Sequence, residues 1–201
     1  MDDGAAMPSI DVKKRRIDSK IVYYGPGRSG KSETLKYIYD HVSAEQRGRL
    51  ASLPTKADPA LHIDVLPVRF GKIIGFETVF HLCSGPGLAS AVNTRRLLLR
   101  DTDGIVFVAD SDPKRRMSNL DALQELQENL DPYGLRLGTV PHVFQYNKCD
   151  LPQRVPTAEL RGELNVHGVP DFETSVTTGQ GILDALRAVV RNVSEDLQKR
   201  L

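Results

Sequence analysis

The feature that most constrains the fold of this chain is the stretch Gly25-Pro26-Gly27-Arg28-Ser29-Gly30-Lys31-Ser32. It matches the pattern G-x-x-x-x-G-K-[ST], and it lies between a short apolar run, residues 21–24, and a segment with apolar residues at helical spacing. In such a strand–loop–helix unit, glycines let backbone N–H groups surround a phosphate chain, and the start of the helix favours an anion. The sequence therefore predicts a phosphate-binding loop.

Two side chains of this loop have specific chemistry. The ammonium group of Lys31 can reach the β- and γ-phosphates of a nucleotide, and the hydroxyl of Ser32 can bind Mg²⁺. The residues predicted to bind phosphate here are Gly25, Gly27, Arg28, Ser29, Gly30, Lys31 and Ser32.

Downstream of the loop, runs typical of strands alternate with segments of helical periodicity. Apolar and polar residues alternate over residues 61–65, a hairpin turn is predicted at Gly71-Lys72, and residues 73–83 form a second, antiparallel strand. Residues 105–109 are a continuous apolar run, as expected of a strand buried on both faces, and residues 140–146 are predicted to form another buried strand. Further helices are predicted over 120–130, 158–164 and 182–197, with a short strand near 172. This pattern predicts an α/β fold of the P-loop type, with a mostly parallel sheet, one antiparallel edge strand and helices on both faces.

The amino-terminal segment, residues 1–18, is polar and contains the basic cluster Lys13-Lys14-Arg15-Arg16. We interpret it as a mobile tail or a short added strand, and the cluster as a solvated face. Residues 19–201 are predicted to form a single domain.

Composition narrows the partners and the compartment. The net charge of +1 gives no argument for a nucleic-acid partner. The two cysteines, Cys83 and Cys149, have no close spacing, which fits a reducing cytosol and neither a disulfide nor a metal site. With no apolar run of about 20 residues and no lipidation motif, we expect a cytoplasmic protein without a direct membrane anchor.

A second motif indicates which base is bound. Asn147-Lys148-Cys149-Asp150 directly follows the predicted strand that ends at 146. A carboxylate at Asp150 can accept hydrogen bonds from N1–H and the exocyclic amine of guanine, whereas adenine offers neither donor there. Asn147 would hold neighbouring loops together, and the aliphatic part of Lys148 would cover one face of the base.

Together these segments resemble the Ras-like small GTPases, and in particular the bacterial gliding-motility polarity GTPases, the MglA family. The resemblance rests on residues 20–27 and 30–32, 104–111 and 145–152, and extends over about 20–197. It implies GTP or GDP and Mg²⁺ as ligands, and a cytosolic switch partnered by a roadblock-fold regulator and by effector proteins. It also implies that the loop containing Ser175 and Val176 contacts guanine, with the backbone N–H of Val176 reaching the guanine carbonyl.

The chain departs from this family at positions that the resemblance associates with catalysis. Pro59 stands where the family has an arginine finger, and Ala60 where it has a threonine for Mg²⁺ and γ-phosphate, in the stretch Thr55-Lys56-Ala57-Asp58-Pro59-Ala60. Leu88 replaces the glutamine that orients the attacking water, whereas Gly87 is retained and can still donate to a γ-phosphate. Ser84 replaces the aspartate usual near Mg²⁺, and its hydroxyl could hold a metal-bound water.

These departures leave no residue that we assign as catalytic, and they predict very slow or absent hydrolysis. Arg95, Arg96, Lys56 and Arg28 are cations that could compensate. The main interpretation is a GTP-binding switch with impaired intrinsic hydrolysis. The alternative is a pseudo-GTPase scaffold that holds guanine nucleotide as a fixed structural ligand and acts only through protein–protein interaction. A metabolic kinase or ATPase is disfavoured by the guanine motif.

Overall fold

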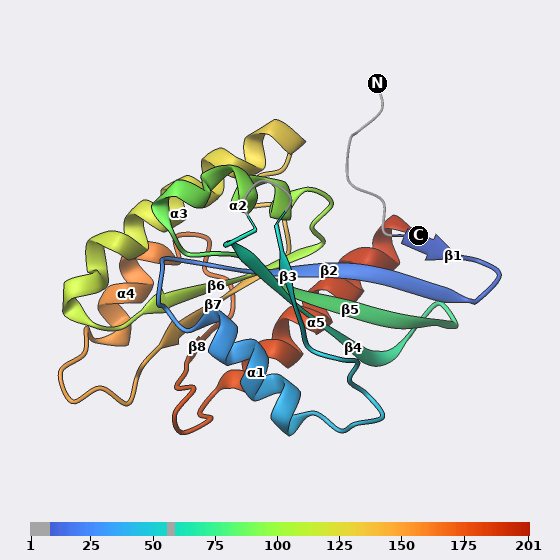
Figure 1. The fold of residues 1–201 in the computed structure, drawn as a ribbon, viewed down its shortest axis with the longest axis horizontal. Coiled ribbons are helices and arrows are strands. Elements are labelled where there is room, and N and C mark those ends of the chain that lie inside the picture. Colours follow the sequence, from blue (N-terminus) through green and yellow to red (C-terminus); the bar gives the residue numbers. More distant parts are fainter. Residues whose placement is uncertain (1–8, 56–58) are drawn as a thin grey trace.

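The computed structural model describes residues 9–55 and 59–201. Within these residues the strands form one eight-stranded sheet in the order β3-β4-β5-β2-β6-β7-β8, with β1 paired to β2 (Figure 1). Strands β5, β2, β6, β7 and β8 are parallel neighbours, whereas the pairs β1/β2, β3/β4 and β4/β5 are antiparallel. The strands are β1 (Ser9–Asp11), β2 (Arg16–Tyr24), β3 (Ala51–Pro54), β4 (His62–Ile73), β5 (Phe76–Ser84), β6 (Gly104–Asp110), β7 (His142–Asn147) and β8 (Asp171–Glu173).

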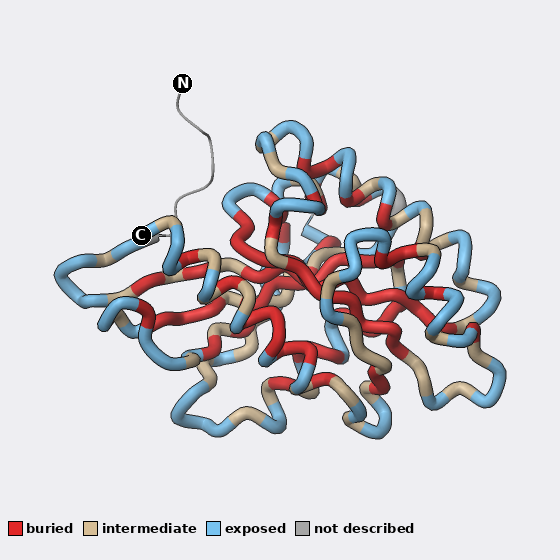
Figure 2. The backbone as a smooth tube through the Cα atoms, turned by 180° about the vertical axis from the view of Figure 1, so that it is seen from behind, coloured by how far each residue is buried: buried red, intermediate tan, exposed pale blue. Residues whose placement is uncertain are grey.

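Helices cover both faces of the sheet, as predicted (Figure 1). Helices α1 and α5 pack on one face, in a core that includes Ile21, Leu35 and Val189, and α2, α3 and α4 pack on the other, in a core that includes Val22 and Leu126. Buried residues run through the middle strands and the inner sides of the helices (Figure 2). The helices are α1 (Lys31–His41), α2 (Val92–Leu99), α3 (Arg116–Leu130), α4 (Thr157–Leu164) and α5 (Ile182–Arg200), with short 3₁₀ turns η1 (Ala89–Ala91), η2 (Pro113–Arg115) and η3 (Asp131–Tyr133). In the part of the chain that the structure describes, no helix combines the length and the apolar character needed to cross a bilayer.

Strand β6 is an inner strand of the sheet, and all seven of its residues are buried. It lies between β2 and β7 with helices above and below, which explains its uninterrupted apolar sequence. Its first residue must be small, because a Cβ atom at Gly104 would lie 2.4 Å from Cγ2 of Val193 on α5. The close contact between α5 and the sheet thus depends on this glycine.

The predicted hairpin between β4 and β5 is present, but its turn was placed wrongly. The turn residues are Ile74 and Gly75, which join the paired residues Ile73 and Phe76. Both have positive φ, 49° and 78° respectively, as a two-residue type I′ turn requires. Gly71, where the turn was predicted, has a φ of 66° and lies instead in a bulge of β4, where the register shifts.

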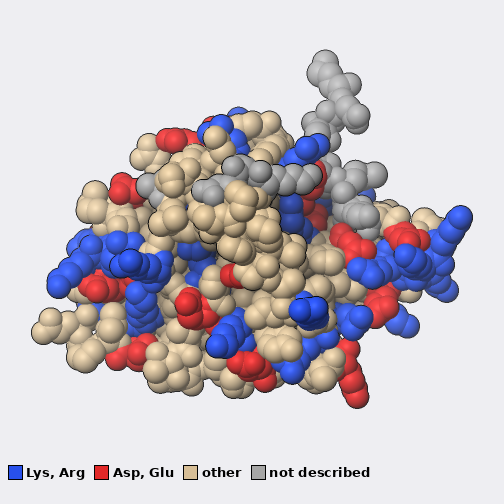
Figure 3. Space-filling view, viewed as in Figure 1, with Lys and Arg blue, Asp and Glu red and all other residues tan. Residues whose placement is uncertain are grey.

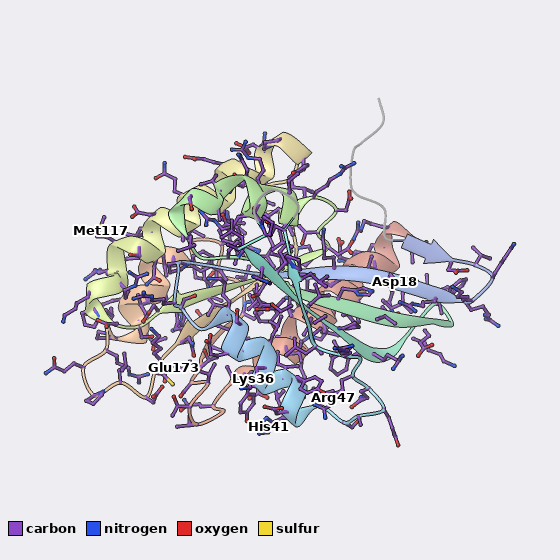
Figure 4. The ribbon with its side chains drawn as sticks, viewed as in Figure 1. Asp18, Lys36, His41, Arg47, Met117 and Glu173 are labelled. Carbon is purple, nitrogen blue, oxygen red and sulfur yellow. The ribbon has the colours of Figure 1, made fainter. Side chains whose placement is uncertain are left out.

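The amino-terminal hairpin shows that ordered structure begins before the predicted boundary at residue 19. Strand β1 pairs with the start of β2, as the added-strand alternative predicted, and residues 1–8 lie outside the described residues. Positive side chains gather at the end of the molecule that carries this hairpin (Figure 3). Asp18 on β2 lies toward that end and pairs with Arg16 and with His81, 2.6 Å away (Figure 4). Part of the basic cluster is therefore neutralised locally.

Two elements were not predicted. Strand β3 lies outside β4, so the antiparallel edge of the sheet has one strand more than expected. Helix α2 contains three consecutive leucines, of which Leu98 and Leu99 are buried while Leu97 is 63% exposed.

Candidate nucleotide-binding site

Loops at the carboxyl ends of the parallel strands meet on one edge of the sheet. Strand β2 leads into the phosphate loop and α1, β7 leads into Asn147–Asp150, and β8 leads into residues 174–181 (Figure 1). In open α/β sheets this edge is where ligands bind. The predicted phosphate and base loops are therefore on the same side of the molecule.

The backbone of the phosphate loop can be built only with glycine at its ends. Gly25 has a φ of 143°, and a Cβ atom there would lie 2.3 Å from the carbonyl oxygen of Val108. Gly30 has a φ of 98° and caps α1, and a Cβ atom there would lie 2.2 Å from Nδ2 of Asn147. The loop is thus pressed against both β6 and the base loop, which explains the glycine spacing of the motif.

Lys31 is folded into this loop. Its Nζ donates to the carbonyl oxygens of Gly25, 2.9 Å away, and Pro26, 2.7 Å away, and the residue is only 6% exposed. Burial, and then the positive charges of Arg95 and Arg115, lower the pKa of Lys31 to about 8. An ammonium group in these surroundings gains strongly from an anion, so the loop suits a phosphate chain.

The base loop and the phosphate loop are joined by direct hydrogen bonds. Nδ2 of Asn147 donates to the carbonyl oxygen of Ser29 at 2.7 Å, and Oδ1 of Asn147 accepts from Oγ1 of Thr174 at 3.3 Å. Lys148, with a φ of 65°, donates from Nζ to Oδ2 of Asp110 at 2.6 Å. Asn147 therefore holds three loops together, the role that the sequence assigned to it.

Asp150 is exposed and close to the loop after β8. The hydroxyl of Ser175 hydrogen-bonds to the Asp150 carboxylate and lowers its pKa, so Asp150 stays ionised. The Ser175 turn is tight, since N–H of Thr178 donates to Ser175 Oγ at 3.2 Å and N–H of Gly179 donates to the Ser175 carbonyl at 2.8 Å. Val176 follows directly, and its Cγ1 would lie 4.0 Å from a Cβ atom on Gly30. The structure thus brings Asn147 and Val176 beside the phosphate loop, and Lys148, Asp150 and Ser175 lie on the same two loops as these residues.

The segment Ser84-Gly85-Pro86-Gly87-Leu88, the second of the two switch segments that the resemblance implies, touches the phosphate loop. A Cβ atom on Gly27 would lie 2.5 Å from the carbonyl oxygen of Gly87, and one on Gly87 would lie 2.4 Å from Cα of Gly27, so this contact needs glycine on both sides. The next residue, Leu88, is 60% exposed. A hollow of about 380 Å³ at this contact is lined by Gly27, Arg28, Gly87, Leu88 and Arg115.

The first switch segment, Thr55-Lys56-Ala57-Asp58-Pro59-Ala60, is described by the structure only in part. Pro59 and Ala60 form an exposed turn before β4, and Lys56, Ala57 and Asp58 lie outside the described residues. Backbone N–H of Thr55 donates to the carbonyl oxygen of Leu61 at 2.7 Å, which closes the loop at its base.

Comparison with known proteins identifies the family. The model of the ADP-ribosylation factor family matches residues 56–193 of this chain. The protein "Mutual gliding-motility protein MglA" of Myxococcus xanthus (strain DK1622) is 44% identical over 193 residues, which cover 96% of this chain and 99% of that protein. The chain belongs to the Arf/Ras-like small GTPase family. The predicted resemblance and the predicted P-loop fold are both confirmed. The phosphate loop itself precedes the range matched by the family model, so its assignment rests on its own geometry and on the longer match.

Two of the cations suggested as replacements for an arginine finger, Arg95 and Arg96, have other partners. Arg95 donates to both carboxylate oxygens of Glu125, from Nε at 2.6 Å and from Nη2 at 2.7 Å. Its Nη1 donates to the carbonyl oxygens of Leu88 and of Pro86, the latter at 3.2 Å. Arg96 donates to Oδ1 of Asn129 at 2.9 Å. Arg28 is exposed at the mouth of the hollow, with a φ of 64°.

Sequence reasoning missed Arg115 at this site. From η2 it donates to the carbonyl oxygen of Gly27 at 2.7 Å, and its Nε lies 4.0 Å from Oδ2 of Asp110. Arg115 belongs to no motif, and only the fold brings η2 over the phosphate loop, so no local signal could have identified it.

The residues present fit a nucleotide with Mg²⁺. The Oγ atoms of Ser32 and Ser84 lie 3.3 Å apart, which places two hydroxyl oxygens together at the start of α1. Ser29 has a buried hydroxyl for which the structure shows no hydrogen-bond partner, beside the buried ammonium of Lys31. Among the described residues no group of three or more His, Cys, Asp or Glu side chains could hold a metal by itself. A bound Mg²⁺ would neutralise phosphate charge, and Ser32 would hold it with the help of Ser84.

Proposed function

We propose that this GTPase-family protein binds GTP and GDP with Mg²⁺ and works as a cytoplasmic switch of the polarity or gliding-motility type, with impaired intrinsic hydrolysis. Guanine binding is supported by the contacts that join Asn147 to Ser29 and Asp150 to Ser175. The motility role is supported by the 44% identity to Mutual gliding-motility protein MglA, whose name states that role for the relative. We further propose that the protein binds a roadblock-fold regulator and effector proteins.

The observation that carries the hydrolysis proposal is Leu88. Its side chain is 60% exposed and lines the hollow beside Gly27 and Gly87, where water could reach a γ-phosphate. An aliphatic side chain cannot orient that water by hydrogen bonding. The absence of an arginine finger removes a further factor of about 10³–10⁵ in rate, and Arg95 is already paired with Glu125.

Single-turnover hydrolysis of GTP with Mg²⁺ tests this proposal. We expect the protein to keep bound GTP intact for hours. Leu88→Gln should raise the rate, and Leu88→Gln combined with Pro59→Arg should raise it further. Leu88→Asn, which has an amide on a shorter side chain, is the matched control and should stay near the starting rate. Hydrolysis by the unmodified protein at an ordinary small-GTPase rate would contradict the assignment of these positions.

The scaffold alternative is favoured by one observation. Arg95 holds the carbonyl oxygens of Pro86 and Leu88, so the second switch is tied to α3 through Glu125. A loop held in this way presents the same surface whichever nucleotide is bound. Hydrogen exchange measured with GDP and with a non-hydrolysable GTP analogue distinguishes the two functions. Equal protection of residues 84–91 supports the scaffold, and nucleotide-dependent protection supports the switch.

A further inference from the structure

Ser84 has an acidic partner on the neighbouring strand. Asp64 of β4 is paired in register with Ser84 of β5, and Oγ of Ser84 donates to Oδ2 of Asp64 at 3.3 Å. On its other side Oγ of Ser84 lies 3.3 Å from Oγ of Ser32. A chain of polar groups therefore runs from the start of α1 through β5 to a carboxylate on β4.

The Asp64 carboxylate is held in place from the opposite side as well. Oγ of Ser52 on β3 donates to Oδ1 of Asp64 at 2.8 Å, and these two residues are also paired in register. Each carboxylate oxygen thus accepts from one serine. Because β3 leads directly into the first predicted switch, the position of Asp64 is linked to that segment.

Charge balance explains why a carboxylate is needed here. Mg²⁺ is a hard cation that keeps several waters and usually binds through one or two carboxylates together with substrate phosphates. Ser32 and Ser84 are both neutral, so alone they would leave the ion with uncharged protein ligands. Asp110, at the end of β6, is fully buried and paired with Lys148 at 2.6 Å, and is therefore occupied near the base loop. Asp64 brings a negative charge to the Ser32–Ser84 pair.

We propose that Asp64 provides the carboxylate for the Mg²⁺ site, in place of the aspartate that Ser84 replaces. It acts as a positioning residue, since it orients the Ser84 hydroxyl and accepts hydrogen bonds from waters of the ion that Ser32 binds. The inference rests on the proposed nucleotide and Mg²⁺ binding. The carboxylate lies on β4, directly opposite the position on β5 that Ser84 occupies.

The test measures nucleotide release rather than hydrolysis. The full chain is loaded with a fluorescent GDP analogue, and its dissociation rate is recorded over a series of free Mg²⁺ concentrations buffered with EDTA. For the unmodified protein we expect release to slow as Mg²⁺ rises. For Asp64→Asn the Mg²⁺ concentration that gives half of this slowing should rise by about tenfold or more, with release in EDTA unchanged.

Two further variants sharpen the result. Glu77→Gln makes the same acid-to-amide change at the opposite end of β5 and should leave the Mg²⁺ dependence unaltered. Asp64→Asn combined with Ser84→Asp returns a carboxylate to the adjacent position and should restore at least part of the dependence, which also shows that the Asn variant is folded.

The outcomes separate the inference from the proposed function. If the unmodified protein shows Mg²⁺-dependent release and Asp64→Asn shows the same half-effect concentration, the role of Asp64 is refuted while nucleotide binding stands. Failure of the double variant to recover Mg²⁺ dependence would also count against it. If the unmodified protein does not bind the analogue, or releases it without regard to Mg²⁺, the proposed ligands are wrong and the inference fails with them.

Discussion

Replacing Glu125 by alanine should destabilise the protein and loosen the second switch. Glu125 on α3 accepts from Arg95 through both carboxylate oxygens, at 2.6 Å and 2.7 Å, and also from the hydroxyl of Tyr24. The Arg95 side chain is 8% exposed and that of Glu125 is 26% exposed. Removing the carboxylate would leave a nearly buried guanidinium group without its charged partner.

The magnitude follows from this burial. Breaking a buried ion pair from one side costs about 3–5 kcal/mol, because the remaining charge is uncompensated. Glu125 is partly exposed and Arg95 keeps its bonds to two backbone carbonyls, so we expect a cost at or just below the lower end of that range, about 2–3 kcal/mol. For a chain of 201 residues this corresponds to a fall in Tm of about 4–12 °C.

Thermal unfolding of the nucleotide-free protein measures this effect, with Glu128→Ala as the control. Glu128 is an exposed residue of the same helix whose Oε1 accepts from Nε2 of Gln124 at 2.9 Å, so its replacement should change stability by less than about 0.5 kcal/mol. Faster hydrogen exchange over residues 84–91 should accompany Glu125→Ala alone. If the two variants unfold at the same temperature, the ion pair does not support the second switch.

The difference in stability between the unmodified protein and Glu125→Ala should depend on pH with a defined sign. Burial by itself raises the pKa of Glu125, but hydrogen bonds from Arg95 and Tyr24 outweigh it and hold the pKa below its ordinary value. A group with a lowered pKa stabilises the folded state fully above its unfolded pKa, about 4.3 for glutamate, and loses that contribution as pH falls through the folded value. The gap in Tm between the unmodified protein and Glu125→Ala should therefore be constant from pH 6 to 7 and shrink below about pH 4.

Three further predictions concern single residues. Asp150→Asn should weaken GTP binding by about 10- to 100-fold and reduce the preference for GTP over ATP in a competition assay; unchanged selectivity would overturn the base assignment. Lys31→Met should abolish nucleotide binding yet raise the Tm of the nucleotide-free protein at pH 7. Because the pKa of Lys31 is lowered to about 8, the cost of its buried charge is present below that pH and disappears by about pH 10.5, so a gain that persists above pH 10.5 would contradict this explanation. Burial raises the pKa of Cys83 to about 11, so a thiol reagent at pH 7.5 should label the less buried Cys149 first and leave Cys83 unmodified until unfolding.

The parallel core of the sheet could be read from sequence because its environment is simple. Strand β6 is covered on both faces, so every position is apolar or tolerates complete burial, and the run from residue 105 to 109 reflects this directly. The long helices α3 and α5 showed their apolar positions over several turns. Their existence followed from the pattern, although α5 extends to Arg200 rather than 197.

The elements that could not be predicted from sequence are short or lie at the edge of the sheet. Helix α2 has eight residues, too few for a periodic pattern, and its three consecutive leucines hide the alternation between buried Leu98 and exposed Leu97. Strand β3 has four residues with mostly exposed side chains, so it carries no apolar signal. The misplaced turn arose because Gly71 and Gly75 both adopt positive φ, and sequence alone does not tell a bulge from a turn.

In the candidate site, too, some residues could be predicted from sequence and others could not. Contiguous motifs predicted a phosphate loop and a base loop, because backbone geometry there demands particular residues at fixed spacing. Asp64 and Glu125 were not found, since each acts through a partner 20 or 30 residues away that only strand register or helix packing brings close. The pairing of Asp64 with Ser84 requires knowledge of the β4/β5 register, which the wrongly placed turn would have shifted.

Binding and hydrolysis depend on parts of this fold that are constrained to very different degrees. Several of the groups assigned to nucleotide binding, such as Ser29, Lys31 and Asn147, are buried and interlocked, as in the bond from Asn147 to Ser29 at 2.7 Å, so a change at one of them disturbs the packing of the others. Leu88 and Pro59 are exposed, and nothing in the surrounding packing requires a glutamine or an arginine at these positions. The fold can therefore lose the groups that orient water and stabilise the transition state while it keeps the groups that hold guanine nucleotide. A chain altered in this way would retain a bound ligand and a stable surface, and the rate at which the ligand leaves, rather than the rate at which it is cleaved, would determine how long that surface persists.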